Sequence, residues 1–239
     1  MKYIYGPVKS RRLGLSLGVS LTPYKTCSFD CIYCQLGETT EKTSEIKEYV
    51  PMDEILGEVR TWAQNNPRWA QEINYLTFSG AGEPTLNSSL GRLIVEIKKI
   101  IPAPLCVITN ASLLTEPQVR QALGAADLVV PSLDAVEPEI FARIDRPHEP
   151  LKIERVIEGL IDFRKEFKGR IWLEVMLVKG VNDDLRHIRK LKEIIERINP
   201  DKVQLNSPVR SACESGVLPV DKNKLNKIIK ILGDKCEAV

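Results

Sequence analysis

The stretch Thr26-Cys27-Ser28-Phe29-Asp30-Cys31-Ile32-Tyr33-Cys34-Gln35 places three cysteines at positions i, i+4 and i+7. This spacing lets one short loop bring three thiolates to three corners of a cubane iron–sulfur cluster. Electron-transfer ferredoxins close the fourth corner with another cysteine, but the next cysteine in this chain is Cys106. An iron that has no protein ligand can bind a substrate and pass it an electron. The loop therefore predicts a [4Fe–4S] cluster with one open iron, held by Cys27, Cys31 and Cys34.

Two other uses of these cysteines fit the chain less well. A zinc site needs a fourth ligand at compatible spacing, and the only histidines, His148 and His187, are not near another cysteine in the sequence. A disulfide framework is typical of small secreted chains, whereas we read no signal peptide here and the chain is long enough for a full core. An iron–sulfur cluster is therefore the preferred interpretation.

The composition describes an ordinary globular chain. It has 239 residues, of which 43% are hydrophobic and 28% charged, and a net charge of +2. Such a small net charge gives no argument for a nucleic-acid partner, and no apolar run approaches the length of a membrane span. Six cysteines in a chain without a targeting segment favour metal or redox work over disulfides. We therefore expect a cytoplasmic protein that does not bind a membrane.

Strand and helix patterns alternate along the chain. Short apolar strand patterns are each followed by a helical stripe of apolar residues, except that the cysteine loop follows the first strand. No repeat, low-complexity tract or linker divides the chain, so we expect one domain over residues 1–239, with an N-terminal extended segment and first strand over 1–22 and the cluster loop over 23–38. The six predicted strands are Leu13–Leu21, Ile73–Phe78, Leu105–Ile108, Leu128–Leu133, Ile171–Val178 and Val203–Leu205.

Polar and glycine-rich residues follow these strands directly. Strict alternation of strands and helices indicates an α/β fold with a parallel sheet and right-handed crossovers. In parallel β/α barrels the strand ends meet at one rim, where the site is built. Six strands would leave a barrel open on one side, so we expect a partial (β/α)6 barrel. The segments at its rim are the cysteine loop, Gly80–Pro84, Thr109-Asn110, Ser132–Asp134, Lys179–Asp183 and Asn206–Pro208.

The CxxxCxxC spacing, with Tyr33 before the last cysteine, resembles the motif of the radical S-adenosylmethionine (SAM) superfamily. The second motif, Gly80-Ala81-Gly82-Glu83-Pro84, resembles the GGE segment of that superfamily with Ala81 inserted. The resemblance spans nearly the whole chain. It implies two cofactors, a [4Fe–4S] cluster and SAM, whose reductive cleavage gives a 5′-deoxyadenosyl radical that takes hydrogen from a substrate.

The resemblance also implies which residues meet SAM. Glu83, with Gly80 and Gly82 beside it, would bind the ammonium of the methionine half. Tyr33 lies near the adenine in this scheme, although it could also simply pack the loop. Further contacts are implied, less strongly, for Asn110, Ser132, Asp134 and Asn206, where Ser132 and Asp134 could instead cap a turn. No catalytic residue is identified.

Several other residues have ordinary interpretations. We expect Glu174 and Met176 on the fifth strand either to face the barrel interior or to pack in the core. Cys106 is expected to be a small buried hydrophobe, and Cys213 and Cys236 to lie outside any cluster. The basic pair Arg11-Arg12, which comes after a Gly6-Pro7 turn, could meet an anionic substrate, but we expect it to form a solvated turn. His148 is expected in a solvated loop, and His187 on the polar side of a helix.

Within the superfamily, the segments Ser10–Gly14, Lys25–Cys27 and Tyr33–Gly37 resemble a group of small proteins of unassigned role, related to the wyosine-tRNA synthesis enzymes. Those enzymes carry extra N-terminal cysteines, whereas this chain has none before Cys27. The substrate is therefore left open among small molecules, peptides and RNA, with tRNA base modification and glycyl-radical enzyme activation as alternatives. The implied partner is a small electron donor such as flavodoxin or ferredoxin. The other class of function to test is an iron–sulfur electron carrier or a metal-stabilised binding module.

Overall fold

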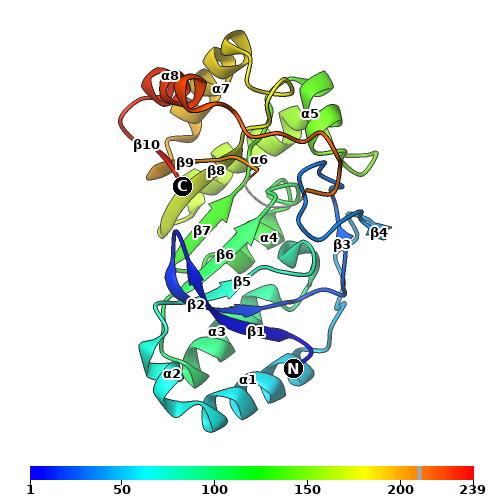
Figure 1. Cartoon of the computed structure of the whole chain (residues 1–239). Coiled ribbons are helices and arrows are strands. Elements are labelled where there is room, and N and C mark those ends of the chain that lie inside the picture. Colours follow the sequence, from blue (N-terminus) through cyan, green and yellow to red (C-terminus); the bar gives the residue numbers. More distant parts are fainter. Residues whose placement is uncertain (209–211) are drawn as a thin grey trace.

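A curved sheet of eight strands organises the molecule (Figure 1). The computed structural model describes residues 1–208 and 212–239. The strand order is β1-β2-β5-β6-β7-β8-β9-β10, and every neighbouring pair from β2 to β10 is parallel. Six of these strands are the predicted ones, and their order in the sheet follows their order in the chain, so the predicted α/β partial barrel is confirmed. They are β2 (Gly14–Val19), β5 (Tyr75–Phe78), β6 (Leu105–Thr109), β7 (Leu128–Pro131), β8 (Arg170–Met176) and β9 (Lys202–Asn206).

The helices form a layer outside the sheet, where neighbours along the chain pack against each other (Figure 1). The buried residues of the helices other than α2 (Pro67–Glu72) pack toward the sheet, and these apolar residues belong to the main core. In α3, for example, Leu90, Leu93, Ile94 and Ile97 recur at the helical period and are all buried. The helices that follow the predicted stripes are α1 (Met52–Asn65), α3 (Leu90–Ile100), α4 (Pro117–Leu123), α6 (Ile153–Glu166), α7 (Leu185–Ile198) and α8 (Lys222–Leu232).

Two edge strands were not predicted. β1 (Ile4–Ser10) pairs antiparallel with β2, and β10 (Cys236–Ala238) adds to β9 at the opposite edge. The predicted Gly6-Pro7 turn is wrong, because both residues lie within β1. The pairing register shifts between Tyr5 and Val8, so the strand absorbs the proline at an irregularity and continues.

Two short helices also escaped prediction. α2 (Pro67–Glu72) and α5 (Pro138–Ile144) each begin with a proline in the first helical turn. Proline is well tolerated at that position because its fixed φ suits a helix and its missing N–H would have no helical partner there. Pro67 follows the end of the preceding helix closely and begins the next one.

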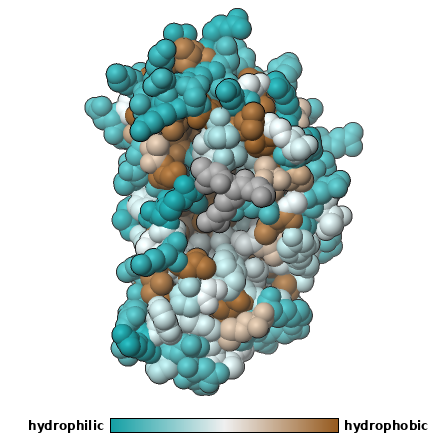
Figure 2. Space-filling model, viewed as in Figure 1, coloured by the Kyte–Doolittle hydropathy of each residue, from teal (hydrophilic) through white to brown (hydrophobic). Residues whose placement is uncertain are grey.

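Apolar side chains occur in several small groups among polar ones on the face shown in Figure 2. No helix within residues 1–208 and 212–239 has the length and apolar character needed to cross a membrane.

Candidate functional site

The cluster loop leaves the sheet at the carboxyl end of β2 and continues into a small parallel pair, β3 (Thr26–Cys27) with β4 (Glu41–Lys42). Its three cysteines are all half-buried and unpaired. The loop is fastened to α5 by two backbone bonds, from Asp30 N to the Asp145 carbonyl and from Ile32 N to the Ile144 carbonyl, each of 3.0 Å. The loop therefore holds the thiols at the rim where the strand ends meet.

The Gly80–Pro84 segment lies directly against the cluster loop. The Lys25 amide donates to the Ala81 carbonyl at 2.6 Å, and the Glu83 amide donates to the Thr26 carbonyl at 3.1 Å. A Cβ added to Gly82 would lie 1.9 Å from the Thr26 carbonyl oxygen, so only glycine permits this approach. Gly80 has φ +111, a conformation that favours glycine. The two motifs thus form one contiguous unit.

Glu83 is buried, with 3% of its surface exposed, and its carboxylate is extensively hydrogen-bonded. Oε1 accepts from the Thr85 amide at 3.0 Å and from the hydroxyls of Thr85 and Thr109 at 2.6 Å, while Oε2 accepts from the Asn110 amide at 2.8 Å. Burial raises the pKa of Glu83, and these donors oppose that rise. The carboxylate therefore fixes the loop after β5 to the end of β6, and Oε2 keeps one further acceptor position.

Asn110 connects the end of β6 to the cluster loop. Its Nδ2 donates to the Ser28 hydroxyl at 2.8 Å and approaches Cys27 Sγ at 3.6 Å. Its Oδ1 accepts from the Ser112 amide at 3.0 Å, and the Ser28 and Ser112 hydroxyls are 2.7 Å apart. Asn110 therefore acts on the cluster loop itself, in addition to any contact with a ligand.

The surroundings of the thiols suit a cluster of negative charge. Lys25 has only 3% of its surface exposed, and its Nζ lies 3.1 Å from Cys34 Sγ. The Phe29 amide lies 3.5 Å from Cys27 Sγ. Hydrogen bonds and charges at the sulfurs are the means by which proteins tune iron–sulfur clusters. Burial raises the pKa of the Cys27 thiol to about 12 in the metal-free protein. Iron binding would have to displace the thiol protons.

The donor set does not suit a single ion. Among the residues that the structure describes, no three Cys, His, Asp or Glu side chains come close enough to share one metal. A zinc ion needs its four ligands about 2 Å from one centre. Three thiols from one loop, with N–H donors and an ammonium directed at them, fit the corners of an iron–sulfur cluster better.

Tyr33 and Asp134, both predicted site residues, are in direct contact. The Tyr33 hydroxyl donates to Asp134 Oδ2, and the Met176 amide donates to Asp134 Oδ1 at 2.7 Å. The Cys31 thiol lies 3.5 Å from a second buried carboxyl, Asp145. Burial raises the pKa of both carboxyls, and the nearby Asp134 raises that of Asp145 further. Asn110, Ser132, Asp134 and Asp145 border one small cavity of about 10 Å³, about the volume that one water occupies.

The other predicted residues face the barrel interior. Gly80 and Asn206 border a cavity of about 540 Å³, which we call the lumen cavity. Its remaining lining comes from β1, from the turn between β1 and β2, from Ser16, Thr77, Ser79 and Ile108, and from Gln35 and Leu36 of the cluster loop. The predicted residues therefore fall into three groups, one in this cavity, one around Asp134, and Gly82 with Glu83 packed against the cluster loop.

Arg12 also lines the lumen cavity, so the prediction of a solvated turn is wrong for Arg12, whereas Arg11 is exposed. Its guanidinium forms an ion pair with Glu174, and the two side chains are only 18% and 12% exposed. Glu174 thus faces the interior, one of the two outcomes expected for it. Leu13, the next residue, packs with Cys106, Leu128 and Val130, which confirms Cys106 as a small buried hydrophobe. Arg12 and Leu13 of the turn between β1 and β2 therefore face the barrel interior.

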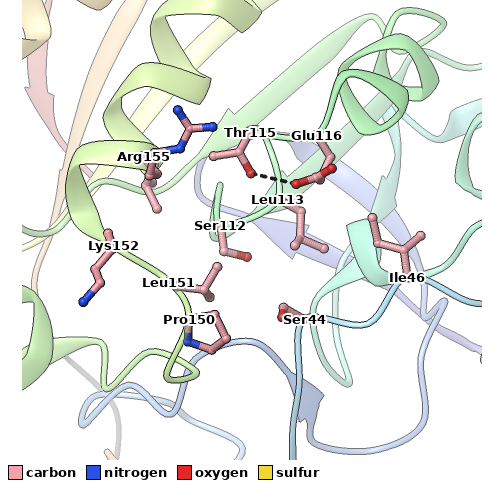
Figure 3. A pocket seen from close by; sticks show the side chains of 11 residues that line it. Ser44, Ile46, Ser112, Leu113, Thr115, Glu116, Pro150, Leu151, Lys152 and Arg155 are labelled. Carbon is pink, nitrogen blue, oxygen red and sulfur yellow. Dashed lines mark hydrogen bonds between the residues drawn. The ribbon is translucent and has the colours of Figure 1, made fainter.

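Another cavity, of about 420 Å³, lies on the outer side of the barrel at the start of α6 (Figure 3). No cysteine and none of the predicted SAM contacts borders it. Ser112 links it to the cluster loop through the bond to Ser28. The lumen cavity, which touches the cluster loop and the rim, is the better candidate for the substrate. The outer cavity is lined by Ser44, Ile46, Ser112, Leu113, Thr115, Glu116, Pro150, Leu151, Lys152, Arg155 and Val156.

Lys25 and Asp145 contact the thiols but were not identified as functional from the sequence. Lys25 lies two residues before the first cysteine, and this position could have indicated a contact with the thiols. Asp145 follows the unpredicted helix α5, so no sequence pattern placed it near Cys31. His187 was expected on the polar side of a helix, but it is 2% exposed and its Nδ1 lies 2.8 Å from Glu137.

The chain is similar to known proteins over most of its length. The sequence profile described as "Radical SAM superfamily" matches residues 21–191. Over 98% of its length the chain is 41% identical to a protein named GTPase Obg from Brachyspira hyodysenteriae, of which it spans 34%. It is 37% identical, again over 98% of its length, to the UPF0026 protein MJ1312 of Methanocaldococcus jannaschii, of which it spans 72%.

The fold is similar to a radical SAM methyltransferase from Sphaerobacter thermophilus, with a TM-score of 0.72 at 16% identity. The match covers 94% of this chain and 66% of the other, and at this identity it concerns the fold alone. The profile match makes the chain a radical SAM enzyme, with the [4Fe–4S] cluster and SAM of that superfamily as its cofactors. Within the superfamily it belongs with the UPF0026 proteins.

Proposed function

We propose that this chain cleaves SAM reductively at a cluster held by Cys27, Cys31 and Cys34, and that it acts on a substrate bound in the lumen cavity. The cluster, when bound, would supply the electron that splits SAM into methionine and a 5′-deoxyadenosyl radical able to abstract hydrogen. The observation that carries the proposal is the joining of the two motifs: the Gly80–Pro84 segment is hydrogen-bonded to the cluster loop through Lys25, Thr26 and Glu83. A bare electron carrier needs no such segment.

The residues predicted to meet SAM keep these roles as proposals. Glu83 Oε2 retains one acceptor position for the SAM ammonium, and Gly80 and Asn206 border the cavity beside the cluster loop. Tyr33, Asn110, Ser132 and Asp134 form the opposite group, where Tyr33 orients the Asp134 carboxylate. Gly82 contributes by letting the backbone approach Thr26. The electron would come from a small cytoplasmic donor such as flavodoxin or ferredoxin.

The size of the lumen cavity bears on the class of substrate. A volume of about 540 Å³ lies within the range of about 300–1,000 Å³ typical of small-molecule sites. We propose a small molecule on this ground, and leave tRNA modification and activation of a glycyl-radical enzyme as alternatives.

The test is anaerobic reconstitution with iron and sulfide, followed by SAM and a strong reductant. We expect 5′-deoxyadenosine to form in the unmodified protein and not in Cys31→Ala, which lacks a cluster ligand but keeps Tyr33 and Glu83. A second variant, Glu83→Gln, replaces charge-assisted hydrogen bonds by weaker neutral ones, so SAM affinity should fall about ten- to a hundredfold. A reconstituted protein that holds a reducible cluster and never forms 5′-deoxyadenosine would overturn the proposal in favour of an electron carrier.

A further inference from the structure

The lumen cavity is bordered by apolar side chains that keep much of their surface exposed. They are Tyr5, Val8 and Leu36, which are 37%, 46% and 37% exposed. Tyr5 and Val8 come from β1 and Leu36 from the cluster loop, so two separate segments bring apolar surface to one space. Covering such surface is favourable because it removes apolar atoms from water. The cavity therefore suits a ligand that has an apolar face.

The ring of Tyr5 lies with one face against β2. A Cβ added to Gly18 would lie 1.9, 2.2 and 2.4 Å from the Cζ, Cε2 and Cε1 atoms of Tyr5. Similar distances to Cζ and to both Cε atoms place the added Cβ over the face of the ring, since a Cβ at the ring edge would be clearly closer to one atom. Tyr5 and Gly18 are also register partners in the β1–β2 pair. The ring therefore lies across the neighbouring strand, on a residue without a side chain.

Two further contacts fix the ring. The Tyr5 hydroxyl lies 2.5 Å from the Ser79 hydroxyl, and a Cβ added to Gly80 would lie 2.8 Å from Tyr5 Cε1. Tyr5 thus touches the start of the Gly80–Pro84 segment. A tyrosine has only two side-chain torsions, so a ring held in this way offers contact area at a low cost in conformational entropy.

A purely structural role does not account for the exposure of Tyr5. An aromatic ring that covers a glycine of the next strand stabilises a sheet edge, and burial of both ring faces would serve that role best. One face of Tyr5 is covered by Gly18, yet 37% of the residue is exposed and it borders the cavity. The face directed away from Gly18 is therefore accessible from the cavity.

The charged side chains of the lining are already paired or solvated. Arg12 pairs with Glu174, and Arg11 donates to the main-chain oxygen of Val239 at 3.0 Å. Lys9 is exposed to solvent. Ligand recognition inside the cavity therefore depends on its apolar and hydroxyl groups.

We infer that the substrate of the proposed reaction, on which this inference rests, is a small molecule with a planar ring that stacks on the accessible face of Tyr5. Tyr5 is then a specificity-determining residue, because it holds the ring beside the segment proposed to bind SAM. Aromatic rings attract each other in offset-stacked arrangements, beyond the area that they bury. Val8 and Leu36 cover other apolar parts of the molecule. The cavity, of about 540 Å³, has room for such a ring and its substituents.

The experiment uses two neutral probes that share one carbon skeleton and one hydroxyl. They are 2-naphthol, which is flat and aromatic, and its saturated analogue decahydro-2-naphthol. Each is titrated into the reconstituted protein with saturating SAM and no reductant, so that SAM fills its own site and is not cleaved. The amide chemical shift of Gly18, which lies under the Tyr5 ring, measures binding. We expect 2-naphthol to bind about two- to tenfold more tightly.

Three variants separate the ring from other features. Tyr5→Leu keeps an apolar side chain but removes the ring, so the preference for 2-naphthol should disappear. Tyr5→Phe keeps the ring and loses the bond to Ser79, so most of the preference should remain. The matched control, Trp69→Leu, removes an exposed aromatic side chain of α2 that does not border the cavity, and should keep the full preference. Magnetisation transfer from 2-naphthol to the Tyr5 ring tests the contact in the unmodified protein.

Three outcomes would overturn the inference. They are equal or undetectable binding of the two probes, an unchanged preference in Tyr5→Leu, and binding of 2-naphthol only when SAM is absent. The last would place Tyr5 in the cofactor site. Formation of 5′-deoxyadenosine is measured on the same preparation after a reductant is added. If it forms while the probes bind equally, the proposed function stands and this inference alone fails. If 2-naphthol stacks on Tyr5 and no 5′-deoxyadenosine forms, the proposed function fails and the ring-binding site remains.

Discussion

The cluster loop (residues 23–38) and the N-terminal hairpin of β1 and β2 border the same cavity, but they are held by different forces. The loop is fixed mainly by hydrogen bonds, to the segments after β5 and β6 and to α5. The turn of the hairpin is fixed inside the barrel by the ion pair of Arg12 with Glu174 and by the packing of Leu13. Removing one partner of a buried ion pair strands the other charge, which costs more than the loss of one neutral hydrogen bond. Substitutions in the loop should therefore affect mainly the cluster, whereas substitutions in the turn should affect mainly the stability of the fold.

The largest effect is expected for the cluster ligands. Cys27→Ala, Cys31→Ala and Cys34→Ala should each abolish the brown colour and reduce iron from about four per chain to near zero. Cys213→Ala and Cys236→Ala are the matched controls and should retain both. Iron analysis and visible absorption after anaerobic purification measure this. Stoichiometric zinc in the unmodified protein, expressed with ample iron, would contradict the assignment.

Breaking the ion pair should destabilise the fold without touching the cluster ligands. Arg12→Met leaves the Glu174 carboxylate buried and unpaired, so we expect a loss of about 3–5 kcal/mol in the free energy of unfolding. Denaturant unfolding measures it. The double variant Arg12→Met with Glu174→Met should recover most of the loss, because no charge is then stranded. A single variant within about 0.5 kcal/mol of the parent would show that the pair is not important.

A substitution that disturbs the close approach of the two motifs should have a smaller effect, on both the free energy of unfolding and the retention of iron. In Gly82→Ala the new Cβ meets the Thr26 carbonyl, so the loop must shift; we expect a loss of about 1–3 kcal/mol and faster loss of iron on dilution. Gly57→Ala is the control. Gly57 lies within α1 with nothing within 4 Å of an added Cβ, and alanine there should stabilise by up to about 1 kcal/mol. Equal iron retention in the two variants would argue against coupling of the motifs.

The smallest effect concerns the ammonium near Cys34. A positive charge stabilises the reduced, more negative cluster, so Lys25→Met should lower the reduction potential by on the order of 50 mV. Lys168→Met, which changes an exposed lysine on the loop between α6 and β8, should leave the potential unchanged. Potentiometric titration of the reconstituted protein measures both. A potential that rises in Lys25→Met would show that Lys25 acts by another route.

The sequence predicted the loop better than the hairpin, and the reason is physical. Cysteine spacing and the glycine-rich segment are local patterns in the sequence. Parallel strands bring successive strand ends together, so the residues at the rim could be inferred from the order of the strands along the chain. Arg12 and Glu174 are far apart in the chain, and no local pattern distinguishes a buried arginine from a solvated one. Asp145 was missed for a similar reason, since it depends on α5, a helix too short to show a clear period.

The most direct test of the central claim is whether the cluster has an iron that is open to SAM. The measurement is the electron paramagnetic resonance spectrum of the reduced, reconstituted protein with and without SAM. The account predicts that SAM changes the spectrum, and that Glu83→Gln requires more SAM for the same change. A spectrum that SAM leaves unaltered at saturating concentration would show a fully ligated cluster and contradict the claim.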